Sequence, residues 1–329
     1  MKRLAIGGLV AGLVSCVTLD AMLPFHDNLH CSDVTPETCG GEPDPWDQIC
    51  YRCDQPYDWA ADYPWRDKSL DTLSTIRAID DATIVDADFE TEDGLATLDA
   101  YYIPAHGEVP ELAGTTIVYN HGQFAGIEHY LPRVRLLHEI GFSVFVWDYR
   151  GYGKSQPNET PTTTQWMSDA RQALETARLY APDGARLVVY GFSVGGIPAG
   201  EMADTGPNCA QIFEAAFVSV REQLKSNMAF GLPGSHLTAG EMETDIKLAD
   251  TIRPTLIIQG TEDTRFRRET AENFYEALPD DVPKSLVFVD GAGHGIGGNG
   301  GVAEAGFGAY RDHLVTFLYE KAPACISQP

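Results

Sequence analysis

The stretch "LVVYGFSVGGIPAG", residues 187–200, decides the fold. It runs from an apolar, β-branched segment into a tight Gly-Phe-Ser-Val-Gly corner, and then into small residues that can begin a helix. A strand, a sharp turn and a helix in this order give the pattern G-x-S-x-G its meaning, because the turn exposes the serine at the end of a sheet. The pattern therefore predicts a strand-turn-helix unit with Ser193 at its corner.

The two glycines of this corner have a physical reason to be there. The turn around Ser193 must be tight, and side chains at Gly191 and Gly195 would collide with the flanking strand and helix. The backbone N–H of Val194 would then lie at a helix N-terminus, where partial positive charge favours a developing oxyanion. We therefore expect Ser193 to be a nucleophile and Val194 to be an oxyanion donor.

Apolar strands and helices alternate on both sides of this corner. The runs predicted as strands are "TTIVYN", "FSVFVWDY", "RLVVYG", "AAFVSV", "PTLIIQG" and "SLVFVD". Helices are predicted near 129–140, near 163–180, from 194, near 267–277 and near 304–320. This alternation is typical of a mostly parallel sheet with helices on both faces, entered here through an antiparallel hairpin around Glu92-Asp93-Gly94. The predicted fold class is α/β.

A serine hydroxyl becomes a good nucleophile only when a base takes its proton, so a histidine and an orienting carboxylate are needed. His294 follows the run "SLVFVD" in a glycine-rich loop, and Asp263 follows "PTLIIQG". Because parallel strands end at the same edge of a sheet, both side chains are expected beside Ser193. Glu262 is the neighbouring alternative to Asp263. The predicted triad is Ser193, Asp263 and His294.

A second oxyanion donor is expected in the loop after "TTIVYN", which reads His121-Gly122-Gln123. Gly122 lets the backbone approach a substrate closely, so the N–H of Gln123 is predicted to point into the site. His121 is interpreted as a buried residue that holds the loop, rather than as a group that transfers a proton.

Residues 82–320 resemble the α/β-hydrolase superfamily. The chain order Ser193, Asp263, His294 is that of the superfamily, and "NHGQ" and "GFSVGG" stand at its oxyanion and elbow positions. The stretches "FETEDG", "WDYRGYGKS" and "GTEDT" are similar to those of a branch with serine aminopeptidase-like proteins, acylglycerol lipases and acyl-thioesterases. The resemblance implies the α/β-hydrolase fold and acyl-enzyme chemistry with no metal and no organic cofactor. The cysteine-rich leader and the glycine-rich loop after His294 depart from the pattern of the superfamily.

Charge and spacing exclude other classes of protein. A formal net charge of −25 at pH 7 repels a phosphate backbone, so nucleic acid is not an expected partner. "GYGKS" at 151–155 lacks the earlier glycine of a phosphate loop, because Asp148 stands in its place. "GIGGNG" at 295–300 is followed by too few residues to complete a dinucleotide-binding unit.

The N-terminus "MKRLAIGGLVAGLVSC" predicts an export signal. Its basic start is followed by an apolar run that is shorter than the about 20 residues that a membrane span needs. The end of the run, Leu13-Val14-Ser15-Cys16, resembles the lipobox of bacterial lipoproteins, in which cleavage leaves a lipid-carrying cysteine first. Residues 1–15 would then be removed, and lipid on Cys16 would attach the exported protein to a membrane of the cell envelope. The alternative is an ordinary signal peptide with an incidental cysteine.

Six further cysteines are disulfide candidates, since an even number in an exported chain favours disulfides. These are Cys31, Cys39, Cys50, Cys53, Cys209 and Cys325. A zinc site made of the first four is the alternative. The predicted organisation is an irregular, cysteine-rich segment at 16–79, a catalytic domain at 80–322 with a possible small cap at 220–253, and a tail at 323–329.

Three functions remain open at this point. The first is hydrolysis of a small carboxylic ester or thioester. The second is aminopeptidase-like cleavage of peptides, for which "GEMETD" offers Glu241, Glu243 and Asp245 to hold a free amine. The third is a surface-binding lipoprotein without turnover, because a fold alone never guarantees activity.

Overall fold

The computed structural model describes Tyr57, Trp59 and residues 77–123, 126–157, 159–220, 242–295, 301–303 and 305–327. Several predicted features lie outside the described residues: the signal segment, Cys16, the first four disulfide candidates, Glu241 and most of the possible cap. The catalytic domain and the tail can be compared with the structure.

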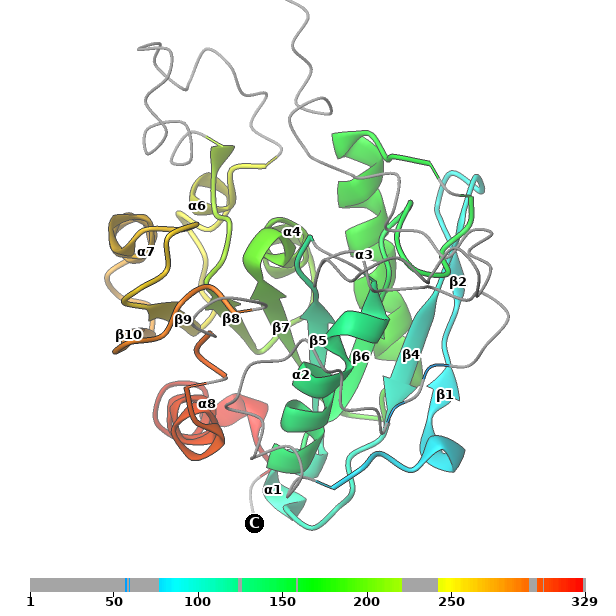
Figure 1. Ribbon diagram of the computed structural model, residues 1–329, viewed down its shortest axis with the longest axis horizontal. Helices are drawn as coiled ribbons and strands as arrows, with labels where there is room; N and C mark the ends of the chain where they lie inside the picture. The colour runs from blue at the N-terminus through cyan, green and yellow to red at the C-terminus, as the bar shows by residue number, and fades with distance from the viewer. Residues whose placement is uncertain are drawn as a thin grey trace, which may run out of the picture.

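An eight-stranded sheet forms the centre of the molecule, in the order β1-β4-β6-β5-β7-β8-β9-β10 (Figure 1). Its strands are β1 (Val85–Asp86), β4 (Ala100–Ile103), β5 (Thr115–Asn120), β6 (Ser143–Trp147), β7 (Arg186–Phe192), β8 (Ala210–Glu214), β9 (Thr255–Gly260) and β10 (Lys284–Val289). β4 pairs antiparallel with β1 and β6, and all later neighbours pair in parallel. The predicted α/β class, with a mostly parallel sheet and an antiparallel entry, is confirmed.

The predicted hairpin is a separate two-stranded sheet. β2 (Phe89–Glu90) and β3 (Thr97–Leu98) pair antiparallel on either side of the turn that contains Gly94. Gly94 has a φ of 66°, a conformation that glycine adopts without steric cost.

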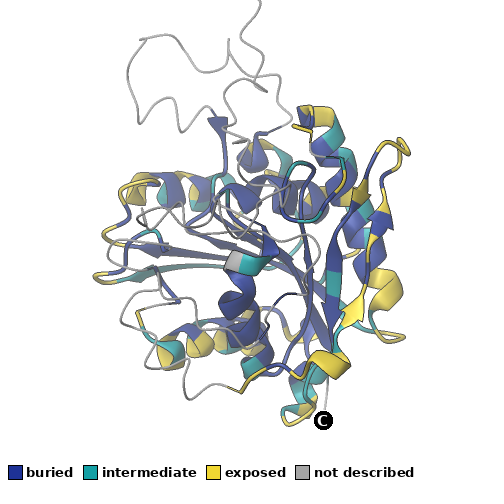
Figure 2. Cartoon of the chain, turned by 45° about the vertical axis from the view of Figure 1, so that its right-hand side comes forward, coloured by how far each residue is buried: buried dark blue, intermediate teal, exposed yellow. Residues whose placement is uncertain are grey.

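Helices cover both faces of the sheet (Figures 1 and 2). α2 (Ile127–Ile140) and α8 (Phe307–Lys321) contribute to one apolar core, and α3 (Thr163–Tyr180), α4 (Gly196–Thr205) and α7 (Arg268–Ala277) contribute to the other. The remaining short helices are η3 (Asp81–Thr83), α1 (Pro110–Ala113), η4 (Ser193–Gly195), α6 (Thr244–Lys247) and η6 (Pro323–Cys325). No helix within the described ranges has the length and apolar character needed to cross a membrane.

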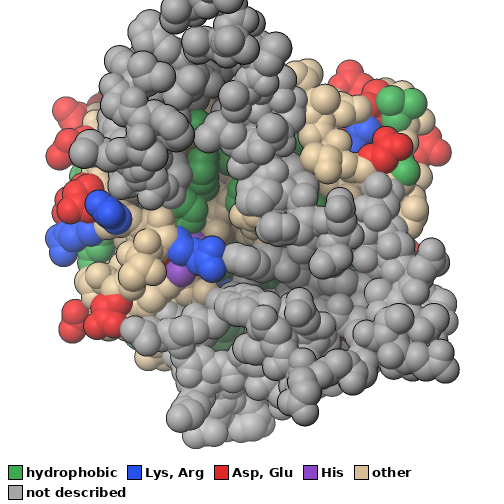
Figure 3. Space-filling model, turned by 45° about the horizontal axis from the view of Figure 1, so that its top comes forward, with side chains coloured by type: hydrophobic (Ala, Val, Ile, Leu, Met, Phe, Trp, Pro, Cys, Tyr) green, Lys and Arg blue, Asp and Glu red, His purple; other side chains and the backbone are tan. Residues whose placement is uncertain are grey.

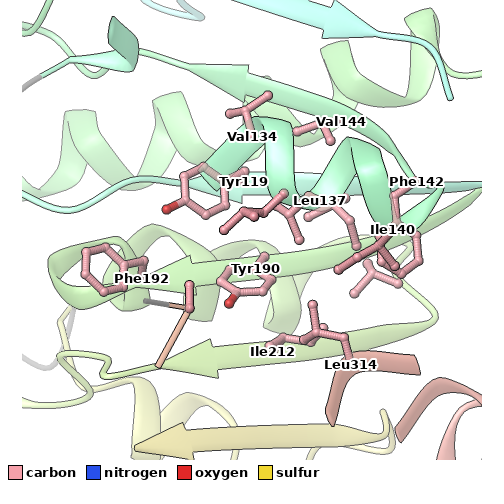
Figure 4. Close-up of a cluster of buried hydrophobic side chains, with 14 of the residues drawn as sticks. Tyr119, Val134, Leu137, Ile140, Phe142, Val144, Tyr190, Phe192, Ile212 and Leu314 are labelled. Atoms are coloured by element: carbon pink, nitrogen blue, oxygen red, sulfur yellow. The ribbon is translucent and has the colours of Figure 1, made fainter. Parts of the chain in front are cut away.

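The strands supply alternate side chains to the two cores, as a sheet buried on both faces requires. Ile117 and Tyr119 of β5 belong to the core under α2, while Val118 between them belongs to the opposite core. Figure 4 shows Leu137 of α2 beside Tyr119, with Tyr190 below them. This packing fixes the carboxyl ends of β5 and β7 side by side.

The predicted strand "AAFVSV", residues 215–220, is wrong. The strand is β8, which ends at Glu214, and Ala215 has a φ of 44° in the left-handed region that turns the chain out of the sheet. The N–H of Phe217 then donates to the carbonyl oxygen of Ser193 at 2.7 Å. The run is apolar because it is largely buried beside the corner at Ser193, and not because it extends the sheet.

A disulfide joins Cys209, just before β8, to Cys325 in η6. Two of the six cysteine candidates are therefore paired in the structure. The bond attaches the beginning of the C-terminal tail to the domain, and the side chain of Cys325 is fully buried there.

Candidate active site

The corner after β7 has the strained geometry that its sequence predicts. Ser193 has a φ of 55°, a conformation that costs a residue with a side chain on the order of 1 kcal/mol. A Cβ atom at Gly191 would lie 2.7 Å from the Cβ atom of Ala199, and one at Gly195 would lie 2.2 Å from the carbonyl oxygen of Asn120. Strand, helix and the end of β5 therefore meet at this corner, where only glycine fits.

The structure brings Ser193, His294 and Asp263 together, although they come from three separate loops. The Nε2 atom of His294 lies 2.9 Å from the Oγ atom of Ser193, and its Nδ1 atom lies 2.9 Å from Asp263 Oδ2. Ser193 and Asp263 are each 7% exposed. Glu262, the alternative carboxylate, is exposed. A serine, an imidazole and a carboxylate in this sequence of contacts can pass a proton from the hydroxyl to the ring.

Asp263 is held as an ion by its surroundings. Burial raises the pKa of its carboxyl, but the hydrogen bond and charge of His294 and two backbone N–H groups lower it, and the net pKa lies below the ordinary value. The two N–H groups are those of Arg265 and Phe266, 2.8 Å and 3.0 Å from Oδ1. The side-chain amide of Gln259 donates to Oδ2 at 2.9 Å. The ionised carboxylate can therefore accept a hydrogen bond from the Nδ1–H group of the imidazole at neutral pH.

Aromatic rings hold the imidazole in place. The ring of Phe192 stacks near that of His294, with centroids 5.5 Å apart and an angle of 29° between the planes. Phe266 contacts the same imidazole at a centroid distance of 5.2 Å. The guanidinium of Arg133 lies 3.9 Å from the centroid of Phe192. Figure 3 shows a histidine, basic side chains and hydrophobic side chains exposed on one face of the molecule.

A buried polar chain lies behind Phe192. Arg133 Nη1 lies 2.7 Å from Glu214 Oε1, and Glu214 also accepts a hydrogen bond from the hydroxyl of Tyr190. The hydroxyls of Tyr190 and Tyr310 are 2.9 Å apart. The buried charge of Glu214 is thus compensated by Arg133, as buried ions require.

The loop with the expected second oxyanion donor begins beside the same corner. A Cβ atom at Gly195 would lie 2.6 Å from the carbonyl oxygen of His121, so the corner and the start of the loop are in contact. Gln123 is half-buried, and Val194 is 8% exposed. A Cβ atom at Gly122 would lie 2.6 Å from the Tyr130 hydroxyl, which explains the glycine.

Two of the three carboxylates considered for amine recognition are buried, and the third, Glu241, lies outside the described residues. Glu243 and Asp245, at the start of α6, are 1% and 7% exposed. Within the described residues, Asp263 is the carboxylate in contact with His294. In the same part of the chain, no three His, Cys, Asp or Glu side chains are grouped so that they could hold a metal ion.

Sequence reasoning missed three residues that hold the triad. Gln259 is the second-last residue of β9, four residues before Asp263. A polar amide near the end of an otherwise apolar strand was the available signal. Phe192 lies inside the quoted corner, at a position to which the pattern G-x-S-x-G assigns no residue type. Arg133 has no local signal, because its partner Glu214 is 81 residues away along the chain.

Comparison with known proteins agrees with this geometry. A family model described as serine aminopeptidase, S33, matches residues 113–239. YfhR of Escherichia coli strain K12 is 26% identical over 237 residues, covering 70% of this chain and 79% of that protein. Rv2307c of Mycobacterium tuberculosis strain H37Rv is 28% identical over 206 residues, covering 62% and 70%.

Two solved structures have the same fold. An esterase of Pyrococcus furiosus, Pf2001, has a TM-score of 0.57 at 20% identity, covering 78% of this chain and 97% of that one. Est1E of Butyrivibrio proteoclasticus, solved with ferulic acid bound, has a TM-score of 0.54 at 18% identity, covering 70% and 96%. With its sheet order, its corner at Ser193 and these structural neighbours, the chain has the α/β-hydrolase fold.

Proposed function

We propose that the protein is a serine hydrolase that cleaves a carboxylic ester or thioester through an acyl-enzyme on Ser193. The observation that carries this proposal is the unbroken series of contacts from Ser193 Oγ through the His294 ring to Asp263, with both distances at 2.9 Å. An alcohol in contact with a base, which is itself oriented by a carboxylate, is the arrangement that acyl transfer needs.

In the first half of the reaction, Ser193 Oγ attacks the acyl carbon while Nε2 of His294 accepts the hydroxyl proton. Asp263 stabilises the imidazolium through Nδ1 and keeps the ring in the correct orientation. The N–H groups of Val194 and Gln123 donate to the oxyanion of the tetrahedral intermediate. His294 then gives the proton to the leaving alcohol or thiol, and the acyl group remains on Ser193.

In the second half, water enters and His294 removes one of its protons. The resulting hydroxide attacks the acyl carbon, the bond to Ser193 Oγ breaks, and the proton on His294 returns to the serine. The products are the free acid and the original enzyme.

The first test replaces the nucleophile. We expect Ser193→Ala to lower turnover of an activated ester by on the order of 10⁴-fold, as the loss of a triad nucleophile does. Ser219→Ala is a matched control, because Ser219 is also buried, at 2% exposed, and is not a member of the triad. Equal rates for wild type and Ser193→Ala would remove Ser193 from the mechanism.

Peptidase activity is the second candidate, because the matching family model is described as a serine aminopeptidase. The esterase proposal is supported by the esterases among the structural relatives, and by the burial of Glu243 and Asp245. Rates should be compared across p-nitrophenyl esters of increasing chain length, acyl thioesters and aminoacyl p-nitroanilides. We expect the esters or thioesters to have the higher kcat/KM, and a preference for the anilides would favour the peptidase.

A further inference from the structure

A buried polar cluster lies against the loop that follows β5. Its centre is Asp148, the residue after β6, and its other members are His121, Asp99 and Tyr57. All four residues are at most 5% exposed, and none of them belongs to the triad. Buried polar groups cost free energy unless they are paired, so the arrangement of this cluster needs an explanation.

Asp148 contacts both ends of the loop. At the start, the Nε2 atom of His121 lies 3.1 Å from Asp148 Oδ1, an electrostatic contact without the geometry of a hydrogen bond. At the end, the N–H of Ile127, the first residue of α2, donates to the same oxygen at 2.8 Å. A Cβ atom at Gly126 would lie 2.8 Å from this carboxylate, and one at Gly153 would lie 1.8 Å from it. One carboxylate, packed against two glycines, thus fixes where the loop leaves β5 and where it enters α2.

His121 connects Asp148 to a single peptide group of the loop. Its Nδ1 atom lies 2.7 Å from the carbonyl oxygen of Gly122, and its ring stacks on that of Tyr149 at a centroid distance of 4.1 Å. The carbonyl of Gly122 and the N–H of Gln123 belong to the same planar trans peptide, so they point in opposite directions. By holding the carbonyl oxygen, His121 determines where the N–H of Gln123 is aimed.

Tyr57 completes the cluster from the cysteine-rich segment. Its hydroxyl lies 3.0 Å from Asp99 Oδ2 and 3.3 Å from Asp148 Oδ2. Burial and the two carboxyl groups raise the pKa of this hydroxyl well above its ordinary value, so it remains a donor. The ring makes edge contacts with Trp59 and Tyr101, and Lys154 Nζ lies 4.0 Å from its centroid. The hydroxyl therefore bridges the carboxyl groups of Asp99 and Asp148.

We propose that Asp148, His121 and Tyr57 are positioning residues for the oxyanion donor at Gln123, and that Tyr57 thereby supports the active site from outside the catalytic domain. The inference rests on the proposed function, since it concerns the oxyanion of that reaction. Tyr57 orients Asp148, Asp148 orients His121, and His121 fixes the peptide between Gly122 and Gln123. None of the three touches the substrate.

The test uses Asp148→Asn and Tyr57→Phe in the full chain. Loss of a whole oxyanion donor costs 10²- to 10³-fold, so a misdirected donor should lower kcat by about 10- to 100-fold in Asp148→Asn and by about 3- to 10-fold in Tyr57→Phe. KM should stay near that of wild type, because the donor acts mainly in the transition state. Rates are expressed per active site titrated with a fluorophosphonate, so that unfolded protein does not count.

A second readout separates positioning from stability. The inhibition constant of an alkyl trifluoromethyl ketone, which forms a tetrahedral anion on the serine, should rise by the same factor as kcat/KM falls. Asp169→Asn and Tyr102→Phe are matched controls. Asp169 is a fully buried carboxylate paired with Arg150, and the buried Tyr102 hydroxyl has no hydrogen-bond partner among the described residues. Both controls should keep the wild-type kcat per titrated site.

Wild-type kcat and inhibition in Tyr57→Phe and Asp148→Asn, accompanied only by a lower Tm, would overturn the inference. If Asp148→Asn does not fold, Tyr57→Phe decides the question. If wild type shows no hydrolysis that depends on Ser193, the proposed function itself fails, and this result is distinct from the failure of the positioning role.

Discussion

The carboxyl of Asp99 makes the stability of the protein depend on pH. Burial and the nearby charge of Asp148 raise the pKa of Asp99 from 3.8 to about 8. The unfolded chain therefore releases this proton at a lower pH than the folded protein does, and stability falls as pH rises from about 4 to about 8. The other titratable groups around Asp99 are Asp88, Lys154, Tyr57 and Tyr101.

The Asp99→Asn side chain carries no charge at any pH, so this substitution removes the loss of stability that accompanies the rise in pH. We expect its Tm to match that of wild type near pH 4 and to exceed it by about 3 °C or more at pH 8. Thermal unfolding at pH 4, 6 and 8 measures the difference, and a difference that does not grow with pH would contradict the assignment.

At the scale of elements, the disulfide between Cys209 and Cys325 closes a loop with a sequence separation of 116. Such a bond stabilises the fold chiefly by restricting the unfolded chain, typically by about 2 to 4 kcal/mol. We expect Cys209→Ser with Cys325→Ser to lose about this much free energy of unfolding, measured by denaturant titration without reductant, while kcat per titrated site stays unchanged. An unchanged unfolding midpoint would show that the bond contributes nothing to stability.

Elements with strong local signals were predictable from the sequence. Helix α3 begins at a Thr162–Gln165 capping box and keeps an apolar stripe, and its predicted range agrees with the structure. β8 was not predictable, because its sequence "AQIFE" includes Gln211 and Glu214, whose burial depends on distant partners.

At the scale of the whole molecule, the sequence predicted the fold and the meeting of Ser193, Asp263 and His294, because strand order and loop position place these side chains at one edge of the sheet. It did not predict the support for that edge. The contact of Tyr57 with Asp148 spans 91 residues and that of Arg133 with Glu214 spans 81, and no local pattern reveals such pairs. The lipid anchor predicted at Cys16 would also act at this scale. We expect Cys16→Ser to move the protein from the membrane fraction to the soluble fraction of a bacterial host, without loss of kcat. Retention in the membrane fraction after this substitution would contradict lipidation at this cysteine.

The most direct test of the central claim is to map a covalent adduct. The protein is incubated with a fluorophosphonate, digested and analysed by mass spectrometry, in parallel with His294→Ala and Ser193→Ala. The contacts at 2.9 Å from Ser193 to His294 and from His294 to Asp263 predict one adduct, on Ser193, which forms far more slowly in His294→Ala and is absent in Ser193→Ala. An adduct on another residue, or no adduct in wild type, would contradict the assignment of Ser193 as the nucleophile.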